Sequence, residues 1–204
     1  LKELEKATSL EINDIPKELP ALRFAVETVV NKLSNSESTT PFSKGSQGQT
    51  INGLIWMGDA NSMVEQARGL KARGFKTIKL KIGALDFDEE LQILKEIREI
   101  CPHPEYTLRL DANGAWGVDA LDKLNQLTEF NIHSIEQPVA PGQFELMKSV
   151  CDNSPIDIAL DEELIGVFEE DEMSSLLDAT CPQYIILKPS LIGGLEMANK
   201  WIAQ

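Results

Sequence analysis

Five charged residues stand at the ends of five successive apolar segments. They are Lys81 in IKLKIG, Asp111 in TLRLDANG, Glu136 in HSIEQP, Asp161 in IALDEE and Lys188 in YIILKP. Consecutive members are 30, 25, 25 and 27 residues apart, which is the length of one strand, one helix and two connecting loops. The charges therefore predict one recurring position at the carboxyl ends of the strands of a βα repeat, where barrel enzymes hold their catalytic groups.

The three carboxylates predict a metal site. Because Asp111, Glu136 and Asp161 end three consecutive strands, they are expected to converge at one rim, and three like charges held together need a cation. An oxygen-only set without His or Cys selects a hard cation, so we predict Mg²⁺, with Mn²⁺ as a substitute. A single Asp at a strand end is more often a helix cap, but the recurrence of a charged residue at the same position in five βα units favours a metal site.

The lysines on either side of this trio predict base chemistry. Lys81 with Lys79 precedes the carboxylates and Lys188 follows them, so they are expected to face one another across a barrel. Removal of a proton next to a carboxylate suits this arrangement, because a metal takes up the charge that develops on the carboxylate oxygens. A lysine base must be uncharged, which nearby cations favour. A K-x-K pair alone is more often a solvated strand edge.

The elements that must position these residues alternate along the chain. Apolar residues at helical spacing predict a helix over Leu19–Leu33, followed by a Ser- and Asn-rich loop. Six strands follow, with helical patterns between them such as Ala60–Arg73, Phe87–Ile100 and Ala120–Phe130, which predicts parallel strands with helical crossovers. The predicted strands are Ile51–Trp56, Thr77–Ile82, Thr107–Asp111, Ile132–Glu136, Asp157–Asp161 and Tyr184–Lys188.

Side-chain parity within the strands favours a barrel over an open sheet. In TIKLKI, Ile78, Leu80 and Ile82 share one face, whereas Lys79 and Lys81 share the other. An open doubly wound sheet would bury both faces under helices, at a high cost for the charges. A barrel lumen that opens onto an active site avoids that cost, so we predict an α/β fold of the (β/α) TIM type.

Composition excludes several other classes of function. With 204 residues, 42% of them hydrophobic, the chain can bury a core of its own. A formal net charge of −14 argues against nucleic acid and anionic membranes as partners, and no apolar run reaches the length of a membrane span. The odd set Cys101, Cys151 and Cys181 predicts buried thiols and a cytoplasmic location. The partner is expected to be a small molecule, and the oligomeric state stays open.

With these residues identified, the chain resembles the enolase superfamily, in its muconate-lactonising-enzyme-like group. The resemblance is carried by TIKLKIG, LRLDANGAW, SIEQP, ALDEE and ILKPSLIGG. It implies an eight-unit barrel behind an N-terminal α+β capping domain, of which this chain shows about six βα units and the last cap helix. Residues 1–49 are then the end of the cap and a linker, and 50–204 are a partial catalytic barrel of a longer polypeptide.

The segment KPSLIGG is similar to the o-succinylbenzoate-forming members of this group. The resemblance implies a Mg²⁺-dependent lyase of menaquinone biosynthesis that dehydrates 2-succinyl-6-hydroxy-2,4-cyclohexadiene-1-carboxylate by syn elimination. Lys81 would be the base and Lys79 its helper, and Lys188 would stabilise the enolate as a cation. The substrate-binding residues would be Asn113, Ser190 and Gly193.

Two other functions remain open at this level. An N-acylamino acid racemase or dipeptide epimerase of the same scaffold would use Lys81 and Lys188 both as proton carriers. A non-catalytic metal-binding or sugar-acid-binding barrel would need the carboxylates but has no use for an uncharged lysine. The complete set of lysines and carboxylates favours an enzyme.

Overall fold

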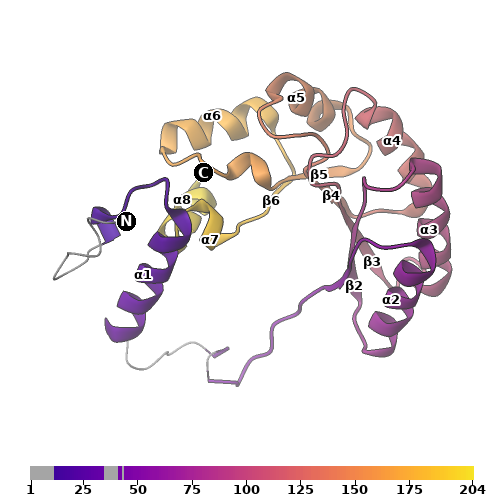
Figure 1. Ribbon diagram of the computed structural model, residues 1–204, viewed down its shortest axis with the longest axis horizontal. Helices are drawn as coiled ribbons and strands as arrows, with labels where there is room; N and C mark the ends of the chain where they lie inside the picture. Colours follow the sequence, from indigo (N-terminus) through magenta and orange to yellow (C-terminus); the bar gives the residue numbers. More distant parts are fainter. Residues whose placement is uncertain (1–11, 35–40, 43) are drawn as a thin grey trace. The chain divides into compact units, whose positions relative to one another are not determined.

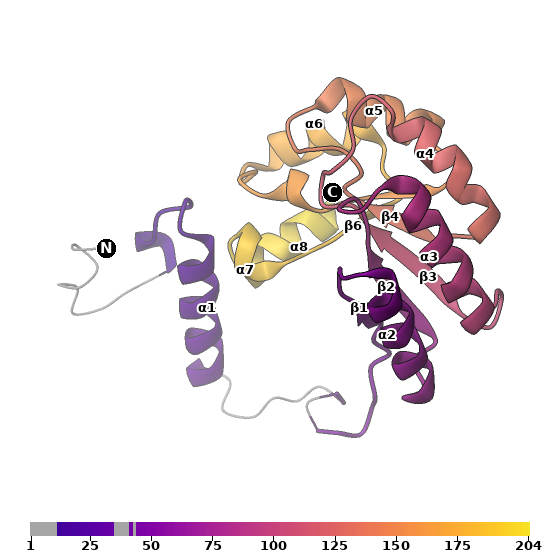
Figure 2. The same cartoon turned by 45° about the vertical axis from the view of Figure 1, so that its right-hand side comes forward.

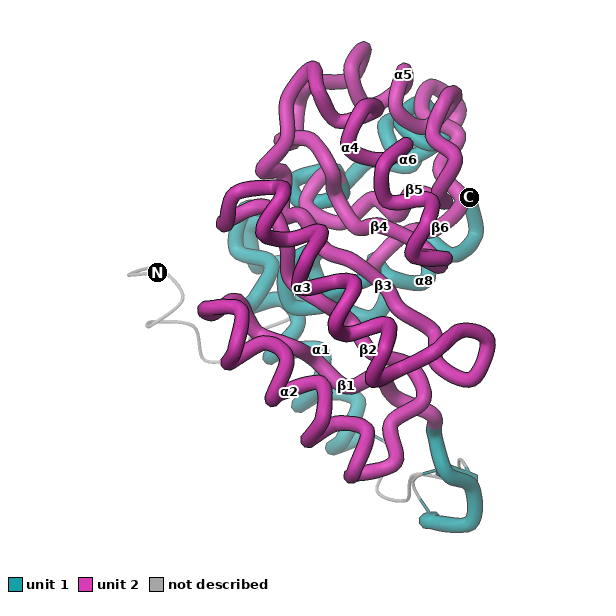
Figure 3. Tube along the Cα trace, turned by 90° about the vertical axis from the view of Figure 1, so that its right-hand side faces the viewer, with its two compact units in different colours: residues 1–49, 164–177, 187–204 teal, residues 50–163, 178–186 magenta. Residues whose placement is uncertain are grey.

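The structure is a computed structural model that describes residues 12–34, 41–42 and 44–204. The chain divides into two compact units, coloured separately in Figure 3. Unit 1 comprises Leu1–Gln49, Leu164–Leu177 and Leu187–Gln204, and unit 2 comprises Thr50–Glu163 and Asp178–Ile186. Residues 35–40 and 43 of the predicted loop lie outside the described residues. The division into a cap end and a partial barrel stays a prediction.

Unit 2 is built on a six-stranded parallel sheet whose spatial order follows the sequence, β1-β2-β3-β4-β5-β6. All six predicted strands are present, which confirms the βα repeat. A parallel sheet in sequential order, with one helical crossover between neighbours, is the arrangement of a (β/α) barrel wall. The strands are β1 Gly53–Ile55, β2 Thr77–Lys81, β3 Thr107–Asp111, β4 Ser134–Glu136, β5 Asp157–Leu160 and β6 Tyr184–Ile185.

Helices cover the apolar face of this sheet. In Figure 1, α2 to α5 lie along one side of the strands, and Figure 2 shows α2 and α3 next to each other beside β1–β3. The strand residues that face them, such as Ile78, Leu108 and Ile158, have no exposed surface. These helices are α2 Ala60–Ala72, α3 Phe87–Ile100, α4 Ala120–Leu127 with its 3₁₀ extension η3 Thr128–Phe130, and α5 Phe144–Asn153.

Local sequence signals set the starts of two of these helices. Asp59 caps α2 by accepting the N–H of Ser62 at 2.9 Å, and Asp86 caps α3 by accepting the N–H of Asp88 at 3.0 Å. Both carboxylates satisfy main-chain donors that have no partner within the helix. Each helix therefore begins at a fixed point after its strand, which sets the length of the loops at the carboxyl rim.

The regular elements in the described part of unit 1 are helices. Its helix α1 Pro20–Ser34 confirms the predicted N-terminal helix and packs on α7 Pro189–Ile192. The carboxylate of Glu27 in α1 accepts the main-chain N–H groups of Leu195 and Glu196 at the start of α8 Leu195–Ala203. An acidic group at that end of a helix complements the helix dipole. The remaining elements are η2 Ile12–Asp14 in unit 1, and η4 Glu162–Leu164 and α6 Glu170–Thr180, each of which includes residues of both units.

Several details differ from the sequence-based predictions. The first strand is limited to Gly53–Ile55, and the sixth ends at Ile185 although the N–H of Ile186 still bonds to Leu160 at 2.8 Å. The polypeptide turns into α7 at Pro189, so Lys188 occupies a loop position before that helix. Cys101 and Cys151 are buried thiols as predicted, but Cys181, which directly follows the end of α6 and has a φ of 46°, is exposed.

Candidate metal and proton-transfer site

The strand register brings charges from three strands into one row. Lys81 of β2 pairs with Asp111 of β3, which pairs with Glu136 of β4. Glu136 in turn pairs with Ala159 of β5. Asp161 comes two residues after Ala159, just after the end of β5, and therefore lies on the same face but beyond this row. Paired residues in parallel strands point to the same face, so all four side chains leave the sheet on the face opposite the covering helices.

The three carboxylates meet at this rim. Asp111, Glu136 and Asp161 each offer an oxygen, and these oxygens lie within 4.8 Å of one another. Their exposed fractions are 0, 1 and 2%. Buried like charges at such distances repel unless cations compensate them. The set consists of hard oxygen donors from three rigid strands, and it therefore fits Mg²⁺, which prefers oxygen ligands.

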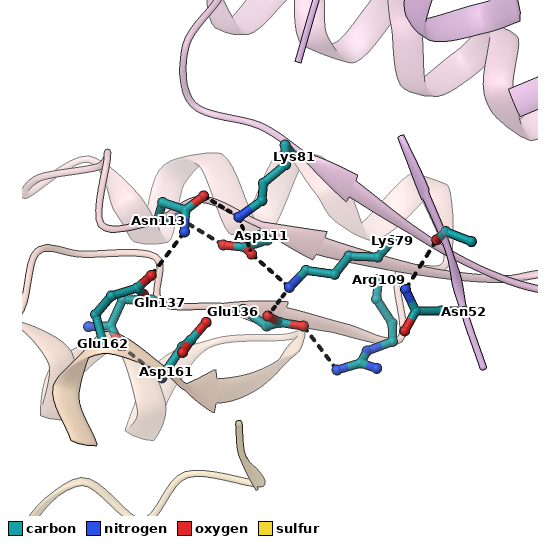
Figure 4. Close-up of polar contacts among 11 residues, drawn as sticks. Asn52, Lys79, Lys81, Arg109, Asp111, Asn113, Glu136, Gln137, Asp161 and Glu162 are labelled. Atoms are coloured by element: carbon teal, nitrogen blue, oxygen red, sulfur yellow. Dashed lines mark hydrogen bonds and ion pairs between the residues drawn. The ribbon is translucent and has the colours of Figure 1, made fainter. Parts of the chain in front are cut away.

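Lysines of β2 reach the same carboxylates, as the dashed lines of Figure 4 show. Lys79 Nζ donates to Asp111 Oδ2 at 2.7 Å and contacts Glu136 Oε2. Lys81 Nζ donates to the same Asp111 oxygen at 2.7 Å and to Asn113 Oδ1 at 2.6 Å. The alternation of the strand places both lysines on one face, so two ammonium groups are held at the edge of the acidic cluster.

Burial and the charged hydrogen-bond partners shift the pKa of each group in this cluster in opposite directions. Desolvation alone would lower the pKa of Lys79, but its hydrogen bonds to Asp111 and Glu136 outweigh it and raise that pKa. Desolvation would raise the pKa of Asp111, but the bonds from Lys79 and Lys81 lower it. For Glu136 desolvation prevails, and its pKa is raised despite Lys79 and Arg109. The contacts of Lys79 with Asp111 and Glu136 thus favour its charged form.

Asn113 links the lysines to the loop after β3. Its main-chain N–H donates to Asp111 Oδ1 at 3.1 Å and its side-chain amide donates to Glu162 Oε1 at 3.0 Å, while its oxygen accepts from Lys81. The residue has a φ of 46°, a left-handed conformation that Asn tolerates better than most residues. Asn113 therefore contacts both Asp111 and the amine of Lys81.

The predicted site residues are distributed over both units. Unit 2 brings together the trio Asp111, Glu136 and Asp161 with Lys79, Lys81 and Asn113. Lys188, Ser190 and Gly193 belong to unit 1. Gly193 has a φ of 107° and ends α7, which explains its residue type without a ligand. The roles of these three residues in substrate binding and charge stabilisation stay predictions.

Two groups of residues at this rim were not assigned roles by the sequence analysis. Arg109 Nη2 donates to Glu136 Oε1 at 2.9 Å, and its position on the lumen parity of LRLD could have indicated this contact. Gln137 and Glu163 lie buried behind the trio. Their only signal was adjacency to ligands, in SIEQP and ALDEE, which does not reveal that they bond to each other.

Comparison with known proteins now identifies the family. Residues 62–204 match the enolase C-terminal domain-like family, and they include every strand from β2 to β6. The chain belongs to this family. Membership of the enolase C-terminal domain-like family confirms the predicted fold class, in which the βα repeat is the wall of a TIM-type barrel.

Individual relatives match most of the chain. It is 47% identical to an o-succinylbenzoate synthase of Desulfotalea psychrophila over 188 residues, which are 90% of this chain and 51% of that protein. It is 27% identical to a hydrophobic dipeptide epimerase of Enterococcus faecalis over 89% of this chain and 51% of the other. The chain therefore spans about half the length of the curated relatives it matches.

Solved structures agree with this assignment. The crystal structure of MenC from Desulfotalea psychrophila matches with a TM-score of 0.82 and 46% identity over 90% of this chain and 52% of that one. An o-succinylbenzoate synthase from Thermosynechococcus elongatus, solved with magnesium in its active site, matches with a TM-score of 0.80 and 26% identity over 100% of this chain and 62% of that one. In the described residues no helix is long and apolar enough to cross a membrane.

Proposed function

We propose that the protein is an o-succinylbenzoate synthase, a Mg²⁺-dependent lyase that dehydrates 2-succinyl-6-hydroxy-2,4-cyclohexadiene-1-carboxylate in menaquinone biosynthesis. The observation that carries the proposal is the pair of lysines on β2 directly beside the buried trio Asp111, Glu136 and Asp161. An amine beside a metal-binding cluster is the arrangement that removal of a proton α to a carboxylate requires. The 47% identity to a synthase supports the choice of this reaction within the family.

In the proposed reaction Lys81 removes the proton from the ring carbon that bears the carboxylate. The C–O bond to the ring hydroxyl then breaks, and Lys81 returns its proton to the departing hydroxide, so the products are water and an aromatic ring. Lys79 contacts two carboxylates, Asp111 and Glu136, whereas Lys81 contacts Asp111 and the neutral side chain of Asn113, and we assign the role of base to Lys81. Asn113 keeps the Lys81 amine directed at the rim through their 2.6 Å hydrogen bond.

Asp111, Glu136 and Asp161 would hold Mg²⁺ or, as a substitute, Mn²⁺. When bound, the ion stabilises the negative charge that develops on the substrate carboxylate. Lys79 and Arg109 add fixed positive charge on the same side, since both contact Glu136. We further propose that Lys188 stabilises the enolate as a cation and that Ser190 and Gly193 contact the substrate.

The proposed setting is cytoplasmic, with a small-molecule carboxylate as the partner. Three free cysteines support a reducing compartment. The net charge of −14 disfavours nucleic acid and anionic lipid as partners.

The test is turnover of the cyclohexadiene substrate by the intact protein, followed by ultraviolet absorbance with Mg²⁺ and with excess chelator. We expect metal-dependent loss of the diene absorbance and formation of the aromatic product. A protein that leaves this substrate unchanged, but exchanges the α-proton of dipeptides or N-acylamino acids for deuterium, would replace the proposal with the racemase or epimerase function.

A further inference from the structure

Gln137 joins two of the strands that carry the carboxylates. It directly follows Glu136 of β4, and its side-chain Oε1 accepts the main-chain N–H of Asp161 at 3.0 Å and that of Glu163 at 3.2 Å. The contact with Asp161 is drawn in Figure 4. A side chain next to one carboxylate thus holds the backbone of another, just beyond the last residue of β5.

A buried carboxylate holds Gln137 in turn. Gln137 Nε2 donates to Glu163 Oε2 at 2.9 Å and to the carbonyl of Val139 at 3.0 Å. Glu163 Oε1 accepts the main-chain N–H of Gly142 at 2.8 Å. The exposed fractions of Gln137 and Glu163 are 0 and 5%. All four side-chain oxygens and nitrogens of the pair therefore have partners, as a buried polar network requires.

The backbone of Gln137 is strained in a way that serves this network. Its φ is 40°, a left-handed conformation that costs a non-glycine residue of this kind about 1–2 kcal/mol. In that conformation its main-chain N–H still reaches the carbonyl of Ala159 at 2.9 Å, and its carbonyl accepts from Gly114 at 2.6 Å. Strain that the surroundings maintain is found mainly at functional sites.

We propose that Gln137, fixed by Glu163, is a positioning residue of the metal site: it holds the main chain at Asp161 so that this carboxylate meets those of Asp111 and Glu136. The inference rests on the proposed metal site. Asp161 lies one residue beyond the end of β5 at Leu160, and the acceptor that Gln137 supplies to its main-chain N–H helps to fix where its carboxylate lies. Groups that orient metal ligands typically change metal affinity about 10- to 100-fold when they are lost.

The experiment measures Mn²⁺ affinity of the intact protein by the electron paramagnetic resonance signal of free Mn²⁺, together with the melting temperature. Gln137→Met keeps the length of the side chain but removes its acceptor and donors. We expect its Mn²⁺ dissociation constant to rise about 10- to 100-fold. The control is Arg98→Met, which removes hydrogen bonds to the carbonyls of Phe130, Cys101, Tyr106 and Asn131 before the amino ends of the strands. It should lower the melting temperature without changing the dissociation constant.

A second set of variants decides the matter if Gln137→Met does not fold. Gln137→Glu keeps an oxygen that can accept the main-chain N–H of Asp161, but it places its second carboxylate oxygen against the carboxylate of Glu163. The double variant Gln137→Glu/Glu163→Gln places an amide donor at position 163 opposite that oxygen. We expect the double variant to bind Mn²⁺ more tightly than Gln137→Glu alone. Equal affinity in the double and single variants, or wild-type affinity in a folded Gln137→Met, would overturn the positioning role alone. A wild-type protein that binds no Mn²⁺ would overturn the metal site as well.

Discussion

Glu136→Gln isolates the contribution of a single ligand charge to the proposed metal site. The substitution keeps the shape of a side chain that is 1% exposed and removes one of three carboxylates. Metal stabilisation of a developing charge amounts to several kcal/mol, and a loss of about 3–4 kcal/mol corresponds to a rate reduced roughly 10²- to 10³-fold. We therefore expect weaker Mg²⁺ binding and a turnover reduced by that factor.

The fold should survive this change. Glu136 accepts hydrogen bonds from Lys79 and Arg109, and bonds to charged groups contribute about 1.5–3 kcal/mol each. In the variant Lys79 keeps its ion pair with Asp111 at 2.7 Å. The side chain of Arg109 is 26% exposed, so water can replace its bond to Glu136. The neutral amide also avoids part of the desolvation that raises the pKa of Glu136. The net loss should stay below about 3 kcal/mol, within the 5–15 kcal/mol of a typical protein.

The assay combines calorimetric titration of Mg²⁺, turnover and thermal unfolding of the same preparation. Glu105→Gln is the matched control, because Glu105 makes an exposed ion pair with Lys76 at 2.6 Å before the amino end of β3. It should leave Mg²⁺ affinity and turnover unchanged. Wild-type Mg²⁺ affinity in Glu136→Gln, or full activity of the wild type in excess chelator, would refute the reasoning.

Three further outcomes are expected. Lys81→Ala should abolish exchange of the substrate α-proton with deuterated water, whereas Lys188→Ala should only slow turnover; loss of exchange in both variants would favour the epimerase mechanism. Gly114→Ala should lower the unfolding free energy by at least about 1–2 kcal/mol, measurable in urea, because a Cβ at its φ of 74° would lie 2.9 Å from Ala140 Cα. Desolvation raises the pKa of Glu90, so folding favours its protonated form. The wild type should therefore lose stability relative to Glu90→Gln as the pH rises from the ordinary pKa of 4.5 through the raised pKa of the folded protein. A difference in stability that does not change with pH would contradict this.

The βα repeat and the charged residues at its strand ends were readable from local sequence. Apolar alternation in TIKLKI and TLRLD predicts two strands whose charges share a face, and the constant spacing predicts the βα repeat that unit 2 contains. These properties depend on the side-chain period of a strand, which the backbone fixes whatever surrounds it. The family assignment followed from the same segments.

The ends of the elements depended on tertiary structure. Apolar residues continue past Ile185 to Leu187, but β5 offers its last main-chain partner at Leu160. The sixth strand therefore stops early, and Lys188 precedes a helix instead of ending a strand. Strand length depends on the neighbour that pairs with it, which sequence alternation does not contain.

The state of each charge was also decided only in three dimensions. Parity placed Lys79 and Lys81 on the same face, but it did not show that Lys79 contacts both Asp111 and Glu136, which favour its charged form. The hydrogen bond between the side chains of Gln137 and Glu163 joins residues that are 26 positions apart in the sequence. Sequence by itself determined which residue types reach the rim, because side-chain period is local. Tertiary structure decided which of them touch and how they are charged, because desolvation and hydrogen bonding depend on every strand that meets there.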